Sequence, residues 1–170
     1  GLVEVLNEVK RHPCWTTPVS GPDRGRGIAL GLWNMPGGMT SCHIVLSGDG
    51  SVKLVIGTVD LSGTRTSLAL IAAECLGLEL ADVRVVIGDT DMTAYSDASA
   101  GDKVTYVMSK AVQEAGRDLM DQLRQLAAED FQVPLEDVLY ERKRFWVVGA
   151  PAMERTLAEL AARGAEPMIG

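Results

Sequence analysis

Residues 52–103 read VKLVIGTVDLSGTRTSLALIAAECLGLELADVRVVIGDTDMTAYSDASAGDK, and the succession of patterns in this stretch decides the fold. A strand-like run over 52–58 is followed by helical spacing of apolar residues over 64–76, which Gly77 ends, and by a β-branched run over 83–87. Strand, helix and strand in this order predict a β-α-β unit with a right-handed crossover and parallel strands. Because the second apolar run is continuous, we expect that strand to be buried on both faces.

The two loops that follow these strands, 57–66 and 88–103, leave from the carboxyl ends of parallel strands. In open α/β sheets this edge is where ligands bind. Each loop ends in small or hydroxyl residues that open a helix, and the second helix is predicted from about 102 to 131. The first N–H groups of a helix lack internal partners and carry partial positive charge, which suits an anion. Arg65 or Lys103 could add a formal positive charge.

A purely structural role for these loops stays open. Ser62, Thr64 and Ser99 also suit helix caps, which is the common role of Ser and Thr at such positions. Carboxylates in the loops would repel phosphate unless they accept hydrogen bonds from loop N–H groups, and the carboxylates concerned are Asp60, Asp89, Asp91 and Asp97.

No metal site is predicted from the second loop. Asp89-Thr90-Asp91 begins like a calcium-binding EF-hand loop, but Ala94 and Ala100 stand where that motif requires glycine and glutamate. Nucleic acid is an improbable partner as well, because the net charge is −7 and phosphate backbones need a basic face.

Upstream of this stretch, apolar runs at 28–33 and 42–46 predict two further strands, which would form an antiparallel meander with 52–56. Apolar residues at helical spacing from Leu2 to Val9 predict an N-terminal helix that ends at His12-Pro13. We therefore divide the chain into an N-terminal helix and linker arm, residues 1–26, and a main domain, residues 27–170.

Downstream, residues 139–148 predict a hairpin around the basic turn Arg142-Lys143-Arg144. Thr156 and Glu159 have the spacing of a capping box before a short helix. The predicted fold class is α+β (mixed α/β). We expect two layers, with a mixed sheet that combines the meander and the β-α-β unit and with helices packed mainly on one face.

Composition narrows the cellular setting. The chain has 170 residues, of which 46% are apolar, enough for a buried core. Its three cysteines, Cys14, Cys42 and Cys75, form no CxxC pair, which favours a reducing, cytoplasmic compartment and small apolar roles for these side chains. No apolar run approaches the length of a membrane span, so no membrane contact is expected.

Three segments carry a family resemblance: GRGIALGLW (25–33), VRVVIGDTD (83–91) and SAGDKVTY (99–106). Residues 24–160 resemble, in order and with few gaps, the second molybdenum-cofactor-binding region of the xanthine dehydrogenase and aldehyde oxidase large subunit. The resemblance is greatest to the bacterial, carbon-monoxide-dehydrogenase-like branch of that family. It implies a cofactor of molybdopterin, in some members extended with a nucleotide, that carries molybdenum in the full-length enzyme.

The resemblance also implies which residues contact this cofactor, and they lie in the two loops already singled out. The cofactor-binding residues carried over are Asp60, Ser62, Gly63, Thr64, Ser99, Ala100, Gly101, Asp102 and Lys103. No direct metal ligand is carried over, because the family holds molybdenum through the pterin dithiolene. Many members have a Gly-Gln-Gly sequence in the first loop, where this chain has Leu61-Ser62-Gly63-Thr64.

No catalytic residue is carried over, because the family's base is a glutamate in a Gly-x-Gly-Glu-type motif and this sequence has none. The chain is therefore expected to be a fragment of a molybdenum hydroxylase, inactive alone. The implied partners are the remainder of the large subunit and the iron–sulfur and FAD subunits or domains. The alternative is a cofactor-free structural or interaction module with the same fold. The isolated fragment is also expected to self-associate through surface that its neighbours normally cover.

Overall fold

A computed structural model describes residues 1–164 and 168–170 of the chain. The chain separates into two compact units, Gly1–Trp33 and Asn34–Gly170. From the sequence we divide the chain into an arm, residues 1–26, and a cofactor-binding domain, residues 27–170. That division stays a prediction. Among the described residues, no helix combines the length and apolar character that crossing a membrane requires.

The first unit contains two helices, α1 (Leu2–Arg11) and α2 (Pro13–Thr16). The predicted break at His12-Pro13 is confirmed, since His12 is extended and Pro13 opens the second helix. The predicted strand over 28–33 is wrong. No described residue pairs with this segment, and Leu32 in its apolar run is 92% exposed. An apolar run forms a strand only where a neighbouring strand satisfies its backbone groups.

The second unit is built on a four-stranded sheet of order β3-β2-β1-β7, comprising β1 (Cys42–Leu46), β2 (Val52–Ile56), β3 (Val83–Ile87) and β7 (Met168–Ile169). Strands β1 and β2 are antiparallel, while β2 and β3 are parallel, which confirms the β-α-β unit. The third antiparallel member is β7, which pairs with β1 in the place expected for residues 28–33.

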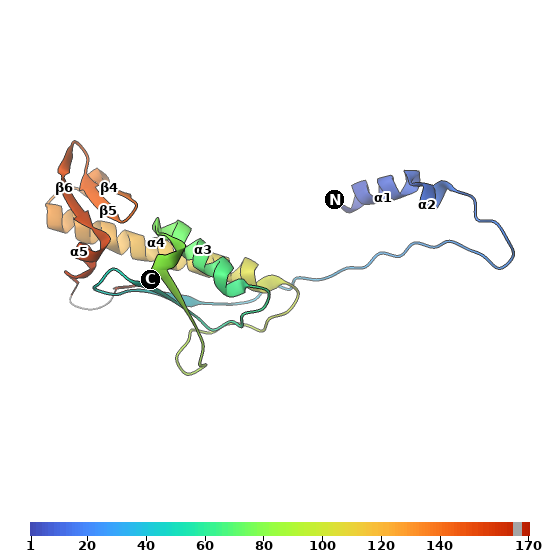
Figure 1. Cartoon of the computed structure of the whole chain (residues 1–170), viewed down its shortest axis with the longest axis horizontal. Coiled ribbons are helices and arrows are strands. Elements are labelled where there is room, and N and C mark those ends of the chain that lie inside the picture. The colour runs from blue at the N-terminus through green and yellow to red at the C-terminus, as the bar shows by residue number, and fades with distance from the viewer. Residues whose placement is uncertain (165–167) are drawn as a thin grey trace. The chain divides into compact units, whose positions relative to one another are not determined.

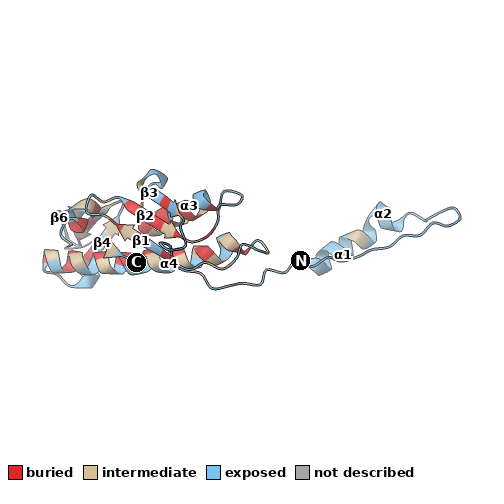
Figure 2. Cartoon of the chain, turned by 90° about the horizontal axis from the view of Figure 1, so that it is seen from below, coloured by how far each residue is buried: buried red, intermediate tan, exposed pale blue. Residues whose placement is uncertain are grey.

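Two helices cover one face of this sheet, α3 (Thr64–Leu76) and α4 (Lys103–Phe131), and Figure 1 shows both on the same side of it. Buried residues collect where these helices meet the strands (Figure 2), among them Ile44, Leu54, Leu68 and Met108. The predicted two layers, with helices mainly on one face, are thereby confirmed.

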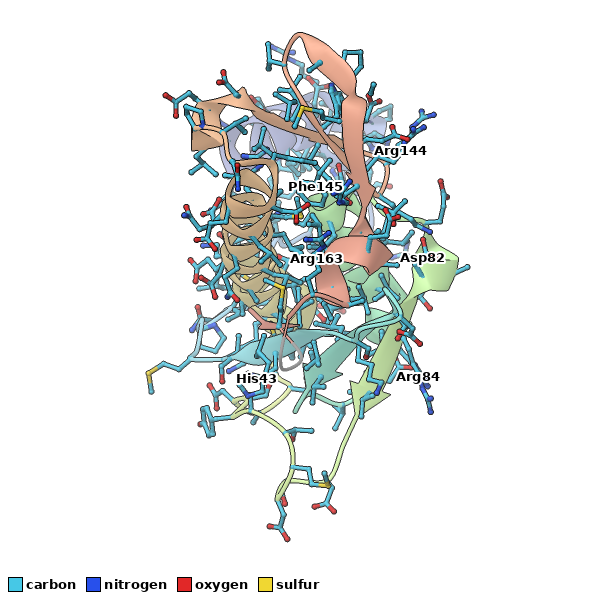
Figure 3. All side chains as sticks on the ribbon, turned by 90° about the vertical axis from the view of Figure 1, so that its left-hand side faces the viewer. His43, Asp82, Arg84, Arg144, Phe145 and Arg163 are labelled. Carbon is cyan, nitrogen blue, oxygen red and sulfur yellow. The ribbon has the colours of Figure 1, made fainter. Side chains whose placement is uncertain are left out.

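The opposite face of the sheet is largely exposed. Figure 3 shows His43 and Arg84 on the side away from α4. The expectation that β3 is buried on both faces is wrong, because β3 is an edge strand whose Arg84 and Val86 are exposed. A continuous β-branched run does not by itself distinguish a central strand from an edge strand.

A second, three-stranded antiparallel sheet packs against α4 and contains β4 (Val138–Glu141), β5 (Arg144–Val147) and β6 (Ala150–Thr156). The predicted hairpin is confirmed as β4 and β5. Strand β6 was not predicted, because its sequence APAMERT is mostly exposed and has no continuous apolar pattern. Two short 3₁₀ helices precede strands, η1 (Leu80–Asp82) before β3 and η2 (Leu135–Asp137) before β4.

Charge pairs join α4 to the end of β6 and to the residues after the helix that follows it. The capping box is confirmed: Glu159 N–H donates to Thr156 Oγ1 at 3.2 Å and Thr156 N–H donates to the Glu159 carboxylate at 2.7 Å, which opens α5 (Leu157–Ala161). Asp130 on α4, whose side chain is 7% exposed, pairs with Arg155 at 2.9 Å and with Arg163. Figure 3 shows Arg163 between α4 and the β6–α5 segment.

Cys42 is expected to resist alkylation in the folded protein. Burial raises the pKa of its thiol to about 11, so the reactive thiolate is roughly one part in a thousand at pH 8. Iodoacetamide treatment of the native polypeptide at pH 8, followed by peptide mass spectrometry, should leave Cys42 unlabelled, whereas the same treatment in denaturant should label it. Equal labelling in both states would contradict the burial of this side chain.

Candidate functional site

The candidate site is built at one edge of the main sheet, where both loops begin. Parallel pairing places Ile56 opposite Ile87, so loop one (57–63) and loop two (88–102) leave the sheet side by side. Loop two also packs directly on Gly57. A Cβ atom at that position would lie 2.3 Å from the Ala94 carbonyl oxygen, so only glycine fits.

In loop one, local hydrogen bonds form a tight turn into α3. The Thr64 hydroxyl donates to the Leu61 carbonyl oxygen at 2.7 Å. The Asp60 carboxylate accepts from Arg65 N–H at 3.0 Å and so caps the helix. The N-cap residue is Gly63, with φ +79°, and it provides no side-chain cap. The capping alternative for Ser62 and Thr64 is therefore wrong, because the capping oxygen comes from Asp60.

Loop two is shaped by a turn near its start and is held in its middle by the segment before β1. Near its start, the Asp89 carbonyl oxygen accepts from Met92 N–H and Thr93 N–H, each at 3.0 Å. Further along, its backbone pairs with the segment that precedes β1. Ser41 N–H donates to the Tyr95 carbonyl oxygen at 2.9 Å, and Asp97 N–H donates to the Met39 carbonyl oxygen at 3.3 Å. The loop ends at Asp102, the N-cap of α4, which has φ +57° and no side-chain cap.

A shallow cradle of about 400 Å³ lies between the two helix starts. Its lining comes from both loops and from the first turns of both helices: Leu61, Ser62, Thr64, Ser99, Ala100, Gly101, Asp102, Val104 and Thr105. The structure thus brings together six of the nine residues that the sequence singled out. Three do not line the cradle, namely Asp60, Gly63 and Lys103.

The charges around the cradle are mostly satisfied within the protein. Three of the four carboxylates that would repel an anion accept backbone N–H bonds: Asp60 from Arg65 at 3.0 Å, Asp89 from Asp91 at 3.0 Å, and Asp97 from Ala98 at 2.8 Å. No described N–H group donates to the fourth, the Asp91 carboxylate. Of the two cations considered for the ligand, Arg65 donates to the Val85 carbonyl oxygen at 3.1 Å and Lys103 pairs with Asp97 at 2.6 Å. The cradle therefore offers backbone groups, hydroxyl groups and the exposed carboxylate of Asp102 rather than a cationic side chain.

The residues that shape the cradle from behind were not predicted from the sequence. The backbone of loop two packs directly against Gly57. Gly38 packs against Asp97, the residue that pairs with Lys103. A glycine between a strand and a turn is a weak signal in a single sequence, and Asp97 gave no sign that it pairs with Lys103. No group of three or more metal-ligating side chains occurs among residues 1–164 and 168–170.

Comparison with known proteins shows the family of the chain. The sequence model described as "Molybdopterin cofactor-binding domain" matches residues 11–169. The chain belongs to this family. It is 31% identical over 122 residues to the carbon monoxide dehydrogenase large chain of Hydrogenophaga pseudoflava, covering 71% of this chain and 15% of that one. It is also 27% identical over 177 residues to a probable xanthine dehydrogenase subunit of Bacillus subtilis, covering 96% of this chain and 23% of that one.

Solved structures agree with these relatives. Carbon monoxide dehydrogenase from Oligotropha carboxidovorans superposes with a TM-score of 0.66 at 30% identity, over 71% of this chain and 15% of that chain. Quinoline 2-oxidoreductase from Pseudomonas putida 86 gives a TM-score of 0.61 at 26% identity, over 72% of this chain and 16% of that chain. The resemblance found in the sequence is thereby confirmed, and the chain corresponds to a small part of each of these proteins.

The residues present fit part of a molybdopterin. When bound, that group supplies the redox chemistry of molybdenum. The cradle is open, and a Cβ atom at Gly63 would meet nothing within 4 Å, so a ligand has room to approach the α3 start. The start of α4 has no side-chain cap, which leaves its N-terminal dipole available to an acceptor or anion. Ser62 and Ser99 add exposed hydroxyl groups at the rim.

Proposed function

We propose that this chain supplies one wall of the molybdopterin site in a larger molybdenum hydroxylase and does not catalyse a reaction alone. The observation that carries the proposal is the meeting of two helix starts, from α3 and α4, around one open cradle. The contacts expected from this chain inside the cradle are made by Ser62, Thr64, Ser99, Ala100, Gly101 and Asp102, and Gly63 leaves room beside them for the ligand. Asp60 and Lys103 act beside the cradle.

The remainder of the site belongs to segments outside this sequence. The chain spans 15% of the Hydrogenophaga large chain, so the pterin's other contacts and a catalytic base would come from the rest of the large subunit. We infer that the native complex also contains iron–sulfur and FAD units that accept electrons. A cytoplasmic location, self-association of the isolated fragment and the dinucleotide form of the pterin are further parts of this proposal.

The proposal predicts cofactor loss when the cradle is filled. Ser99 is exposed in the cradle lining, so Ser99→Trp should occupy the space of the ligand without disturbing the core. Molybdenum, by atomic emission, and pterin, by fluorescence after oxidation, would be measured in the native complex purified from its own host. We expect at least a roughly tenfold loss of both, since a ring that fills the cradle excludes the ligand sterically.

The matched control is Gln113→Trp, which places the same side chain on an exposed position of α4 away from the cradle. It should retain full molybdenum and pterin content. If the unaltered complex is folded and complete but contains neither, the alternative of a cofactor-free structural module is correct. Equal cofactor content in Ser99→Trp and the unaltered complex would place the cofactor elsewhere.

A further inference from the structure

Lys103 is the one charged residue in the buried class among the described residues, with 6% of its surface exposed. It is the first residue of α4 and directly follows Asp102 of the cradle. A buried ammonium group is strongly destabilising unless a counter-charge and hydrogen bonds compensate it. The environment of Lys103 therefore has to contain such a partner.

The partner is Asp97, whose Oδ2 accepts from Lys103 Nζ at 2.6 Å. The same carboxylate accepts from Ala98 N–H through Oδ1 at 2.8 Å. These two bonds hold the pKa of Asp97 below its ordinary value, with the Lys103 hydrogen bond as the larger cause, so the carboxylate is ionised at neutral pH. The pair closes the end of loop two, because its members are six positions apart and the cradle residues 99–102 lie between them.

A third segment covers this pair. A Cβ atom on Gly38 would lie 2.5 Å from Asp97 Oδ2 and 2.9 Å from Lys103 Nζ, so the backbone at Gly38 rests directly on the charges. Thr40 forms an isolated antiparallel bridge with Ser96 beside it. Lys103 lines this small internal gap together with Gly38 and Asp97, and it does not line the cradle.

We propose that Lys103 is a positioning residue whose ion pair with Asp97, beneath Gly38, clasps the start of α4 to loop two and thereby sets the shape of the cradle, instead of contacting the cofactor with its ammonium group. The effect on the cofactor rests on the proposed function, whereas the clasp itself does not. Since the pair closes the segment that carries Ser99 to Asp102, opening it loosens the cradle wall that these residues form.

The test is a double-mutant cycle in the native complex with Lys103→Met, Asp97→Asn and the combination. The first readout is hydrogen–deuterium exchange of peptides from 88–102, and the second is molybdenum and pterin content. A clasp predicts that each single variant speeds exchange in this loop, on the order of tenfold, and lowers cofactor content to a similar extent. The double variant should then be little worse than either single variant.

A direct ligand role predicts a different pattern. Asp97→Asn would free the ammonium group, so cofactor content would be kept or raised, while Lys103→Met alone would lower it; that result overturns the proposal. Asp97→Asn is nearly isosteric, so it threatens folding least of the three variants. If this variant leaves hydrogen exchange in residues 88–102 unchanged, the proposal is overturned as well. If the unaltered complex contains no cofactor, the proposed function fails, and the exchange measurement still decides the clasp.

The matched control is the pair Lys143–Asp82, which has the same Nζ–Oδ2 distance of 2.6 Å and lies outside both loops of the cradle. Lys143→Met should leave exchange in 88–102 and cofactor content unchanged. If removing any lysine had a general electrostatic effect, Lys143→Met and Lys103→Met would change loop exchange and cofactor content alike.

Discussion

Phe145→Ala is expected to lower the free energy of opening of the second sheet by about 3–5 kcal/mol, the range for truncating a fully buried aromatic side chain. Phe145 is 0% exposed, and its ring lies 4.4 Å from that of Tyr140 across the β4–β5 pair. Figure 3 shows it between α4 and β6. Hydrogen exchange of β4 and β5 in the native polypeptide measures this free energy region by region.

Leu139→Ala provides the control on the neighbouring strand, because Leu139 is 42% exposed. Its loss should be below about 1 kcal/mol, as for surface substitutions. Similar losses in both variants would show that this sheet has no packed core of its own. The first turn of α4 lines the cradle. Phe145→Ala should therefore lower cofactor content more than Leu139→Ala only if it destabilises α4 along its whole length.

The fold was predictable where local pattern and long-range pairing agree. The strand at 83–87 and the helix at 64–76 form a β-α-β unit whose handedness and parallel pairing follow from general rules. The apolar run at 28–33 fails because strand formation depends on a partner, and the position beside β1 is occupied by β7. Nothing local to residues 28–33 encodes that outcome.

The candidate site was predictable to the level of its loops, and less so for individual side chains. Ser62 and Ser99, 37 positions apart, line one cradle, as expected for the carboxyl edge of parallel strands. Lys103 was assigned by analogy to the ligand, but its burial and its bond to Asp97 depend on how loop two folds back over the sheet edge. Side-chain direction at a loop end depends on tertiary contacts, which spacing does not reveal.

Gly57→Ala is expected to displace loop two and so cause at least a roughly tenfold loss of molybdenum and pterin from the native complex, which corresponds to about 1.4 kcal/mol. The added Cβ would lie 2.3 Å from the Ala94 carbonyl oxygen and 3.2 Å from Thr93 Oγ1. Backbone cannot yield as a flexible side chain does, and overpacking of this kind costs about 1–3 kcal/mol. Strand β2 is anchored by two neighbours, so the loop moves instead.

Gly48→Ala is the matched control, since it lies in the turn at the other end of the β1–β2 hairpin and its Cβ would meet only Ala162 Cα, at 3.9 Å. This variant should keep its cofactor. Hydrogen exchange separates the two possible causes of loss in Gly57→Ala. Faster exchange confined to 88–102 means that the loop moved while the sheet stayed intact. Faster exchange throughout β1, β2 and β3 would mean that the sheet opened, and retained cofactor would show that the position of loop two does not control binding.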